Sequence, residues 1–565
     1  MQNGRHNFLQ GAMILSGAIV IVKILGAIYK IPLTNMIGEM GMSAFNTAYQ
    51  LYMPIYTIAS AGLPAAVARF VSAQCAAGNM RSARMIFRKC MPMLLLSGGV
   101  GMILMELGAG FYANAVGNPA AVWSVRMLAP TVFFCCIVSG LRGYYAGLQN
   151  MTPTALSQIL EAVGRLVLGL SGARAMLIYC RTEYRQSGTV LGQSFADETA
   201  ALGFSSALAS AAAIFGVTAG SLFGLIALLL YDRCHRPLRL SRTEIRADPL
   251  KMGPILRSAM PICAGALMIN LCSVLDTMLL QTRIRMISPD ILRGRFLGLE
   301  SVADADIPSF LYGSFGMAQN LAAFVPTMAQ AIGTSALSSV AYAAAHCMQA
   351  LRDAVEDVLR LTALIAFPAG FGLSAIAGPV LLLLYGVRPN GAQIAAPSLI
   401  MLGFASVFMT LSVPVNSMLQ AVGRADIPVK LLILGFAVKW TANMCFISIP
   451  SLNLVGACMG TLLCYALVSC VGLIALARCC KRIRIGRCLL RPLLAGALCA
   501  AAAYAVSTGL AAYSPEIRVS AAIAAAFVVY AAALLFSRVL CRRDLEMLPG
   551  GKKMADGLAK HGWIR

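Results

Sequence analysis

Apolar segments recur along the whole chain, and each is close to the roughly 20 residues that a membrane-spanning helix needs. Short polar turns separate these segments, and no long polar stretch interrupts the series. The pattern therefore predicts an all-α polytopic membrane protein of about 14 transmembrane helices with no separate soluble domain. The predicted spans are residues 8–31, 44–71, 90–112, 123–148, 154–179, 200–231, 252–281, 310–336, 355–385, 397–421, 428–449, 454–477, 493–510 and 519–536.

A motif that occurs twice suggests an internal duplication. The first copy is Leu148-Gln149, then Pro153 and a helix that carries Glu161 and Arg165; the second is Leu419-Gln420, then Pro428 and a helix that carries Lys439. Proline suits a first helical turn, where its missing N–H costs nothing. Two related halves indicate a transport-type fold with its working site between the repeats. We expect an N-terminal lobe at residues 1–232, a C-terminal lobe at 233–486, and two further helices with a basic tail at 487–565.

Composition and charge agree with a membrane location. The chain is 59% hydrophobic and 12% charged, with a mean hydropathy of +0.77, whereas a soluble domain carries about 25% charged residues. The net charge of +23 comes from Lys and Arg that cluster in alternate loops. Because cytoplasmic loops carry the basic residues, both termini are expected in the cytoplasm. Aromatic residues do not interleave with the basic clusters, which argues against nucleic-acid binding.

The sequence lacks the usual signs of catalysis. Most of the eighteen cysteines lie in apolar segments, there is no Cys-x-x-Cys, and the four histidines are scattered, so no metal site is expected. Nucleotide-binding and nucleophile-elbow motifs are also missing. We therefore expect no enzyme, no cofactor and no catalytic residues. Transport would draw on the membrane potential, on H⁺ or Na⁺, or on the substrate's own gradient.

Charged residues inside the predicted spans are the candidate site, because each costs on the order of 3 kcal/mol at the bilayer centre. The basic members are candidates for an anion, and the others for coupling or for a polar cavity wall. The basic candidates are Lys23, Lys30, Arg69, Arg165 and Lys439, and the others are Glu161, Asp276, Gln319 and Asn320.

Simpler interpretations of these residues stay open. Lys30 and Arg69 lie near helix ends, where long side chains reach water, and Glu161 with Arg165 can form an i,i+4 ion pair. Gln319 and Asn320 suit hydrogen bonds between helices. Arg142 is expected at a cytoplasmic helix end, where a cation complements the helix dipole or meets a headgroup.

Several motifs resemble the stage V sporulation protein B group of the multidrug/oligosaccharidyl-lipid/polysaccharide exporter superfamily, which includes lipid II flippases. The similarity is strongest over residues 23–165. The motifs are Lys23-x-x-Gly26-x-x-Tyr29-Lys30-Ile31-Pro32-Leu33, Ala61-Gly62-Leu63-Pro64, Leu141-Arg142-Gly143-Tyr144-Tyr145, Asn150-Met151-x-Pro153, Ser157-Gln158-x-x-Glu161 and Arg165.

The resemblance implies two six-helix lobes, two extra helices, and a central cavity that opens alternately to each side. It also implies an undecaprenyl-pyrophosphate-linked sugar as substrate, with Lys23, Lys30 and Arg69 as first-lobe contacts of the pyrophosphate. MurJ-type members favour arginines in the first span and an acid in the second, where this chain has lysines and Gln50. The identity of the sugar therefore stays open.

We weigh four functions. The leading hypothesis is an alternating-access flippase in the cytoplasmic membrane, acting as a monomer on lipid II or a related precursor beside membrane lipids and cell-wall synthesis proteins. The alternative is a cation-coupled multidrug antiporter, which an acidic cavity with aromatic surfaces would favour. A non-transporting scaffold does not explain the buried charges. A glycosyltransferase would need clustered carboxylates, for which Asp353, Glu356 and Asp357 are candidates, although acids also suit a helix start.

Overall fold

The computed structural model describes residues 2–60, 62–195, 198–234, 252–296, 298–300, 302–480 and 483–537. Much of the charge on which the predicted orientation rests, in residues 235–251 and 538–565, lies outside these ranges. The chain divides into two compact units, Met1–Gly313 and Ser314–Arg565. The predicted three-part division, with a boundary after residue 232, stays a prediction.

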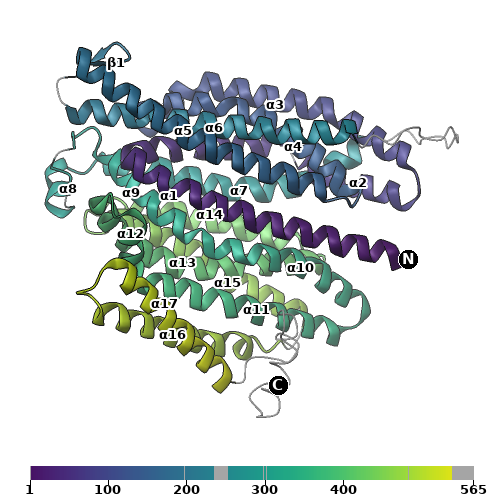
Figure 1. Cartoon of the computed structure of the whole chain (residues 1–565). Helices are drawn as coiled ribbons and strands as arrows, with labels where there is room; N and C mark the ends of the chain where they lie inside the picture. Colours follow the sequence, from purple (N-terminus) through teal and green to yellow (C-terminus); the bar gives the residue numbers. More distant parts are fainter. Residues whose placement is uncertain are drawn as a thin grey trace. The chain divides into compact units, whose positions relative to one another are not determined.

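The first unit is built from long helices and one small hairpin. Its elements are α1 (Gln2–Ser60), α2 (Leu63–Ala76), α3 (Met80–Val116), the 3₁₀ turn η1 (Pro119–Ala121), α4 (Val122–Gly147), α5 (Thr152–Ser187), β1 (Thr189–Val190), β2 (Gln193–Ser194), α6 (Glu198–Cys234), α7 (Met252–Ile284), α8 (Pro289–Arg295) and the start of α9 (Ile307–Ala322). Helices α3, α4, α5 and α6 run lengthwise beside one another (Figure 1). The strands pair antiparallel, Thr189 with Ser194.

The second unit contains the rest of α9 and eight further helices within the described residues. These are α10 (Phe324–His346), α11 (Met348–Ala375), α12 (Ala377–Tyr385), α13 (Pro389–Ala421), α14 (Asp426–Phe446), α15 (Asn453–Cys480), α16 (Ile485–Gly509) and α17 (Pro515–Phe536). Helix α13 packs against α10, α11 and α15, and α16 packs against α11 and α17.

The all-α membrane fold is confirmed. Eleven helices of the described part are long and apolar enough to cross a bilayer, and one of them, Gly17–Cys75, contains the second predicted span and residues 17–31 of the first. At three places the helices are joined or divided differently from the predicted spans. Helix α1 continues past the first predicted span and bends at Gly38, whose φ of 65° and ψ of −169° suit glycine alone. The predicted spans 310–336 and 355–385 are each divided, at Ala323 and Ile376.

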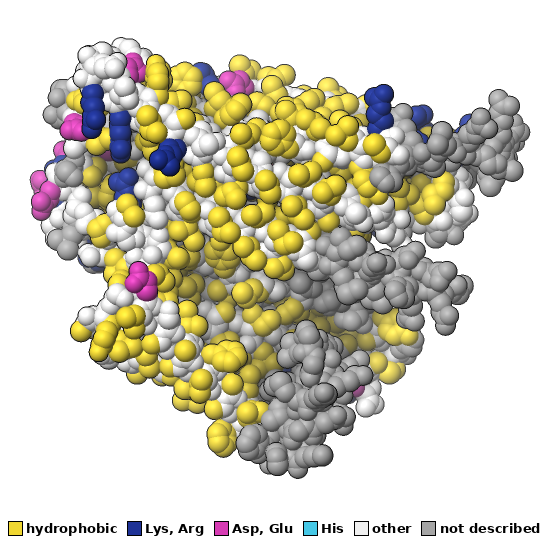
Figure 2. Space-filling model, viewed as in Figure 1, with side chains coloured by type: hydrophobic (Ala, Val, Ile, Leu, Met, Phe, Trp, Pro, Cys, Tyr) yellow, Lys and Arg dark blue, Asp and Glu magenta, His cyan; other side chains and the backbone are white. Residues whose placement is uncertain are grey.

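The surface of the first unit fits a lipid environment. In the upper part of Figure 2, hydrophobic side chains cover the middle of the face formed by its helices, and charged side chains gather mainly toward the ends. Large apolar side chains lie on this unit's surface, and Leu107 and Phe111 of α3 are 79% and 82% exposed. In water such a surface would be costly, but in a bilayer it faces acyl chains of equal polarity.

Helices α5 and α6 pack with their backbones very close together, because glycines line the contact. Gly216, Gly220 and Gly224 recur every fourth residue of α6. A Cβ atom added to Gly216 would lie 2.3 Å from the backbone nitrogen of Gly169 in α5, and one added to Gly220 would lie 2.6 Å from the carbonyl oxygen of Glu161. Small residues at this spacing let membrane helices approach closely.

The duplicated motif forms the same turn in both units. Helix α4 ends before Gln149, whose φ is 58°, and α13 ends before Gly423, whose φ is 83°. In each turn the residue with positive φ, Gln149 or Gly423, donates its backbone N–H to the carbonyl oxygen three residues earlier. The N–H of the residue that follows it bonds to the carbonyl oxygen five residues earlier, and all four distances lie between 2.9 and 3.0 Å. This double bond pattern closes a helix end. The two helices that follow, α5 and α14, both begin with proline in the first turn.

Candidate functional site

The candidate site is a cluster of charged side chains where α4, α5 and α1 of the first unit meet. Glu161 lies on α5 and accepts two hydrogen bonds from guanidinium groups, one on each carboxylate oxygen. Arg165 donates from Nη2 to Oε1 at 3.1 Å, and Arg142 of α4 donates from Nη2 to Oε2 at 2.9 Å. The Nε of Arg142 also donates to the Ser157 hydroxyl at 3.0 Å. We call Arg142, Glu161 and Arg165 the arginine–glutamate cluster.

The local sequence explains why these groups meet. Ser157, Glu161 and Arg165 follow one another at intervals of four on α5, so they share one face of that helix. The tight turn at Gln149 brings the last part of α4, with Arg142, back against the first turns of α5. The glycines of α6 pack against this same part of α5, and a Cβ atom added to Gly224 would lie 3.4 Å from the Cβ of Glu161.

The cluster carries excess positive charge and is only partly covered. The side chains of Glu161, Arg142 and Arg165 are 17%, 22% and 31% exposed, so each is within reach of water or a ligand. Lys30 of α1 is half-buried and lies close enough to Arg165 to repel it. The two guanidinium groups outnumber the one carboxylate that they share, and the buried Nε of Arg165 has no hydrogen-bond partner. Such an unsatisfied charged donor favours an added anion.

A row of aromatic side chains on α1 runs along this site. Phe45, Tyr49, Tyr52 and Tyr56 share one face of the helix, with neighbouring ring centroids between 4.9 and 6.0 Å apart. Tyr49 interacts electrostatically with Arg165 and Glu161, and Tyr56 interacts with Arg142. The row of aromatic rings therefore extends along the α1 side of the site, from Tyr49 near Arg165 to Tyr56 near Arg142.

The other predicted basic residues lie in different settings. Lys23 is exposed on α1 and is close enough to Lys30 to interact with it electrostatically. Arg69 is exposed on α2 and makes no ion pair or hydrogen bond with any residue of the described ranges. Lys439 lies on α14 of the second unit and is buried, with an exposed fraction of 3%. Its convergence with Arg165 on one cavity stays a prediction.

The predicted polar residues are also placed. Asp276 is buried on α7 beside Tyr312 of α9, whose hydroxyl shares a 2.8 Å hydrogen bond with Thr277. Gln319 and Asn320 lie half-buried on the part of α9 that belongs to the second unit. Their expected roles stay predictions.

The expectation for Arg142 was wrong. Arg142 lies one turn and a half before the end of α4 and binds Ser157 and Glu161. The expected i,i+4 ion pair between Glu161 and Arg165 does form. The spacing of nineteen residues between Arg142 and Glu161 follows no helical period, and only the tight turn between the helices brings them together. The available signal was the polar face that Ser157 and Glu161 form on α5, next in sequence to a helix whose last turns carry Arg142.

The carboxylates considered for a glycosyltransferase have structural partners. Asp357 of α11 pairs with Arg360 at 3.2 Å, and Glu356 accepts a hydrogen bond from the backbone N–H of Arg484 at 2.9 Å. These contacts account for two of the three acids as links within the second unit.

The sequence of this chain is similar to those of several known proteins. The polysaccharide biosynthesis protein family matches residues 8–196. The lipid II flippase MurJ of Bacillus subtilis is 24% identical over 490 residues, which is 83% of this chain and 82% of that protein. Stage V sporulation protein B of the same organism is 30% identical over 203 residues, or 35% of this chain and 38% of that protein.

Two solved structures share the fold. A lipid II flippase MurJ in an inward closed conformation has a TM-score of 0.59 at 12% identity, covering 93% of this chain and 99% of that one. An inward-facing MATE family transporter has a TM-score of 0.59 at 14% identity, covering 81% and 94%. The fold is thus that of the polytopic MurJ and MATE proteins. The resemblance to the stage V sporulation protein B and MurJ proteins is thus confirmed as a similarity in sequence and in fold.

Proposed function

We propose that this protein is an alternating-access flippase that moves an undecaprenyl-pyrophosphate-linked sugar, lipid II or a related wall precursor, across the cytoplasmic membrane. Both termini would lie in the cytoplasm, and the membrane potential, H⁺ or Na⁺ would supply the energy. The named MurJ relative supports this substrate class. A monomer suffices for the mechanism, and contacts with cell-wall synthesis proteins would follow from the substrate.

The observation that carries the proposal is the excess positive charge around Arg165. Its Nε lacks a partner, and Lys30 repels it from the α1 side. A pyrophosphate oxygen would satisfy the free donor and reduce the repulsion between the cations. Glu161 holds both arginines in place while no substrate is bound, and a phosphate group would compete with its carboxylate for them.

The second unit offers an equivalent cation. Arg165 lies sixteen residues after the left-handed residue Gln149, and Lys439 lies sixteen residues after its counterpart Gly423. Glycine of the next helix packs against each site, with Gly220 beside Arg165 and Gly460 beside Lys439. The duplication thus supplies one cation from each repeat, half-buried at Arg165 and buried at Lys439, as expected for a transporter whose repeats share a substrate.

The test measures flipping of labelled lipid II in proteoliposomes. Arg165→Gln should lower the rate about tenfold or more, because one charge-assisted contact to phosphate is lost. Arg174→Gln is the matched control, since Arg174 is an exposed cation on the same helix without an ion pair among the described residues. Lys23→Ala tests the first-span lysine in the same assay. Wild-type rates in the Arg165 variant would reject this site.

The aromatic row beside Glu161 favours a second candidate, a cation-coupled multidrug antiporter, because stacked rings with an acid bind organic cations. Against it, both oxygens of Glu161 are already bound by guanidinium groups. Export of cationic dyes by wild type, without flipping of any lipid-linked sugar, would decide for the antiporter.

A further inference from the structure

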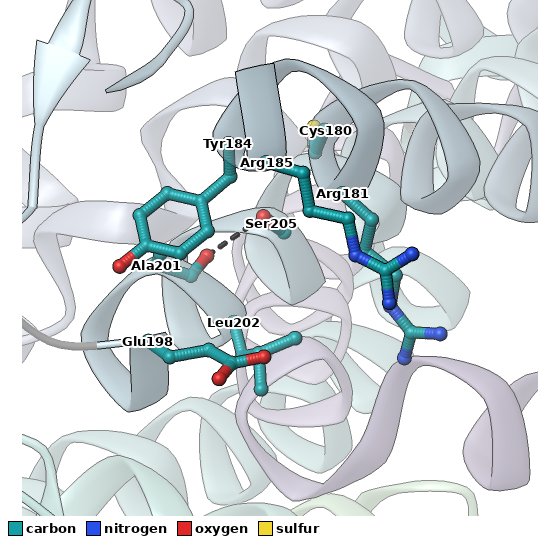
Figure 3. A pocket seen from close by; sticks show the side chains of 8 residues that line it. All are labelled: Cys180, Arg181, Tyr184, Arg185, Glu198, Ala201, Leu202 and Ser205. Atoms are coloured by element: carbon teal, nitrogen blue, oxygen red, sulfur yellow. Dashed lines mark hydrogen bonds between the residues drawn. The ribbon is translucent and has the colours of Figure 1, made fainter. Parts of the chain in front are cut away.

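A second site lies far from the arginine–glutamate cluster, between the ends of α5 and α6 next to the hairpin β1–β2. A pocket of about 200 Å³ opens there, lined by Arg181, Tyr184 and Arg185 of α5 and by Glu198 and Leu202 of α6 (Figure 3). Beneath it, Cys180 and Val190 are fully buried in a small apolar core under the hairpin. The floor of the pocket is therefore fixed.

The charges of this pocket are not neutralised by one another. Arg181 and Arg185 are exposed and project from α5 in the same direction (Figure 3). Neither forms an ion pair with a residue of the described ranges, and neither does Glu198, although it lines the same pocket. Two cations and one anion that face a common space without pairing suit a ligand that carries both charges.

The surroundings indicate a lipid rather than a soluble molecule. Arg181 directly follows the apolar residues 175–180 of α5, at the kind of position where charged and aromatic residues mark the membrane interface. Just before it, Ile178 and Tyr179 are 56% and 55% exposed. A ligand in the pocket thus has apolar surface beside it on the side of the bilayer, as the acyl chains of a phospholipid need.

We propose that this pocket binds the headgroup of phosphatidylethanolamine. The phosphate lies between the guanidinium groups of Arg181 and Arg185, and the primary ammonium donates hydrogen bonds to the carboxylate of Glu198. Phosphatidylcholine presents the same phosphate, but its quaternary ammonium has no N–H to donate. The pocket therefore selects between two zwitterionic lipids. This site stands apart from the flippase proposal and does not depend on it.

The test uses the full-length protein in nanodiscs that contain equal amounts of the two lipids, with retained lipids counted by native mass spectrometry. Wild type should retain phosphatidylethanolamine about tenfold more than phosphatidylcholine, the effect of one charge-assisted contact. Glu198→Gln should abolish this preference and keep the binding of both lipids. Arg181→Gln with Arg185→Gln should weaken both lipids alike. Arg174→Gln, with its cation on the same helix outside the pocket, should match wild type.

Three results would overturn the proposal: equal retention of the two lipids by wild type, an unchanged preference in Glu198→Gln, or unchanged binding in the double arginine variant. Soluble phosphoethanolamine is the last arm. It should not displace the lipid at equal concentration, and displacement would show that the ligand is a soluble zwitterion. The substituted side chains are exposed or at the pocket rim, and melting temperatures of the variants check that they fold.

Discussion

Glu161 shows how a single carboxylate organises cations that would otherwise repel each other. It holds Arg142 and Arg165 on separate oxygens, and its side chain is the least exposed of the three. Lys30 adds a third positive charge nearby. Removing the carboxylate therefore does more than break two hydrogen bonds, since it leaves like charges facing each other in a medium of low polarity.

We predict that Glu161→Gln lowers the free energy of unfolding by about 1–3 kcal/mol, the usual cost when hydrogen bonds to a charged partner are lost. Thermal unfolding in detergent measures it. Glu300→Gln is the control, because Glu300 is exposed and makes no ion pair with a described residue. Equal melting temperatures for the two variants would show that the cluster contributes no stability.

Asp306 provides a pH-dependent test outside the membrane-spanning helices. Burial raises the pKa of its carboxyl, and the nearby Arg285 guanidinium opposes part of this rise. The folded state then binds more protons than the unfolded state in the window between the two pKa values, so stability falls as pH rises through it. Asp306→Asn should therefore gain stability relative to wild type as the pH rises above the ordinary pKa of an aspartate carboxyl. A difference in melting temperature that stays constant as the pH rises would contradict this.

Among whole elements, the packing of α5 against α6 depends most clearly on glycines, which have no side chain to keep the two backbones apart. A methyl group at Gly220 would meet the backbone of Glu161 and Arg165, at 2.6 Å from the carbonyl oxygen and 2.9 Å from the nitrogen. Neither atom belongs to a flexible side-chain end, so the helices must separate.

We predict that Gly220→Ala destabilises the protein by about 1–3 kcal/mol, as overpacking of a close contact does, and slows transport by displacing Arg165. Gly203→Ala in the same helix is the matched control, since a methyl group there meets nothing within 4 Å. Thermal unfolding and the flipping assay measure both variants. Similar behaviour of the two alanine variants would mean that the glycine contact is not required.

Prediction from sequence succeeded at the level of elements and failed where helix rotation or tertiary contact decides. Periodic apolar segments locate all the predicted spans on helices, because the bilayer imposes length and polarity. The partner of Glu161 on α4 was missed, since no local spacing relates Arg142 to it. The bend at Gly38 was missed as well, because an unbroken apolar pattern does not reveal one glycine with positive φ.

At the scale of the whole molecule, the open prediction is orientation. In a cysteine-free background, Ser187→Cys at the end of α5 should react with a membrane-impermeant maleimide in intact cells. Arg81→Cys near the start of α3 should react only after lysis, because its loop belongs to the basic, cytoplasmic set. Both positions are exposed. The reverse labelling pattern would place the termini outside.

The continuous course of α5 has one further consequence. The helix runs unbroken from Thr152 to Ser187. Its close glycine contacts with α6 hold the two helices together as one rigid pair. Arg165 and Arg181 stand sixteen residues apart on it, about 24 Å at 1.5 Å per residue. If α5 tilts as one rigid helix, Arg165 and Arg181 must move together. A lipid bound at Arg181 would therefore oppose the movement of Arg165 that the proposed transport cycle requires.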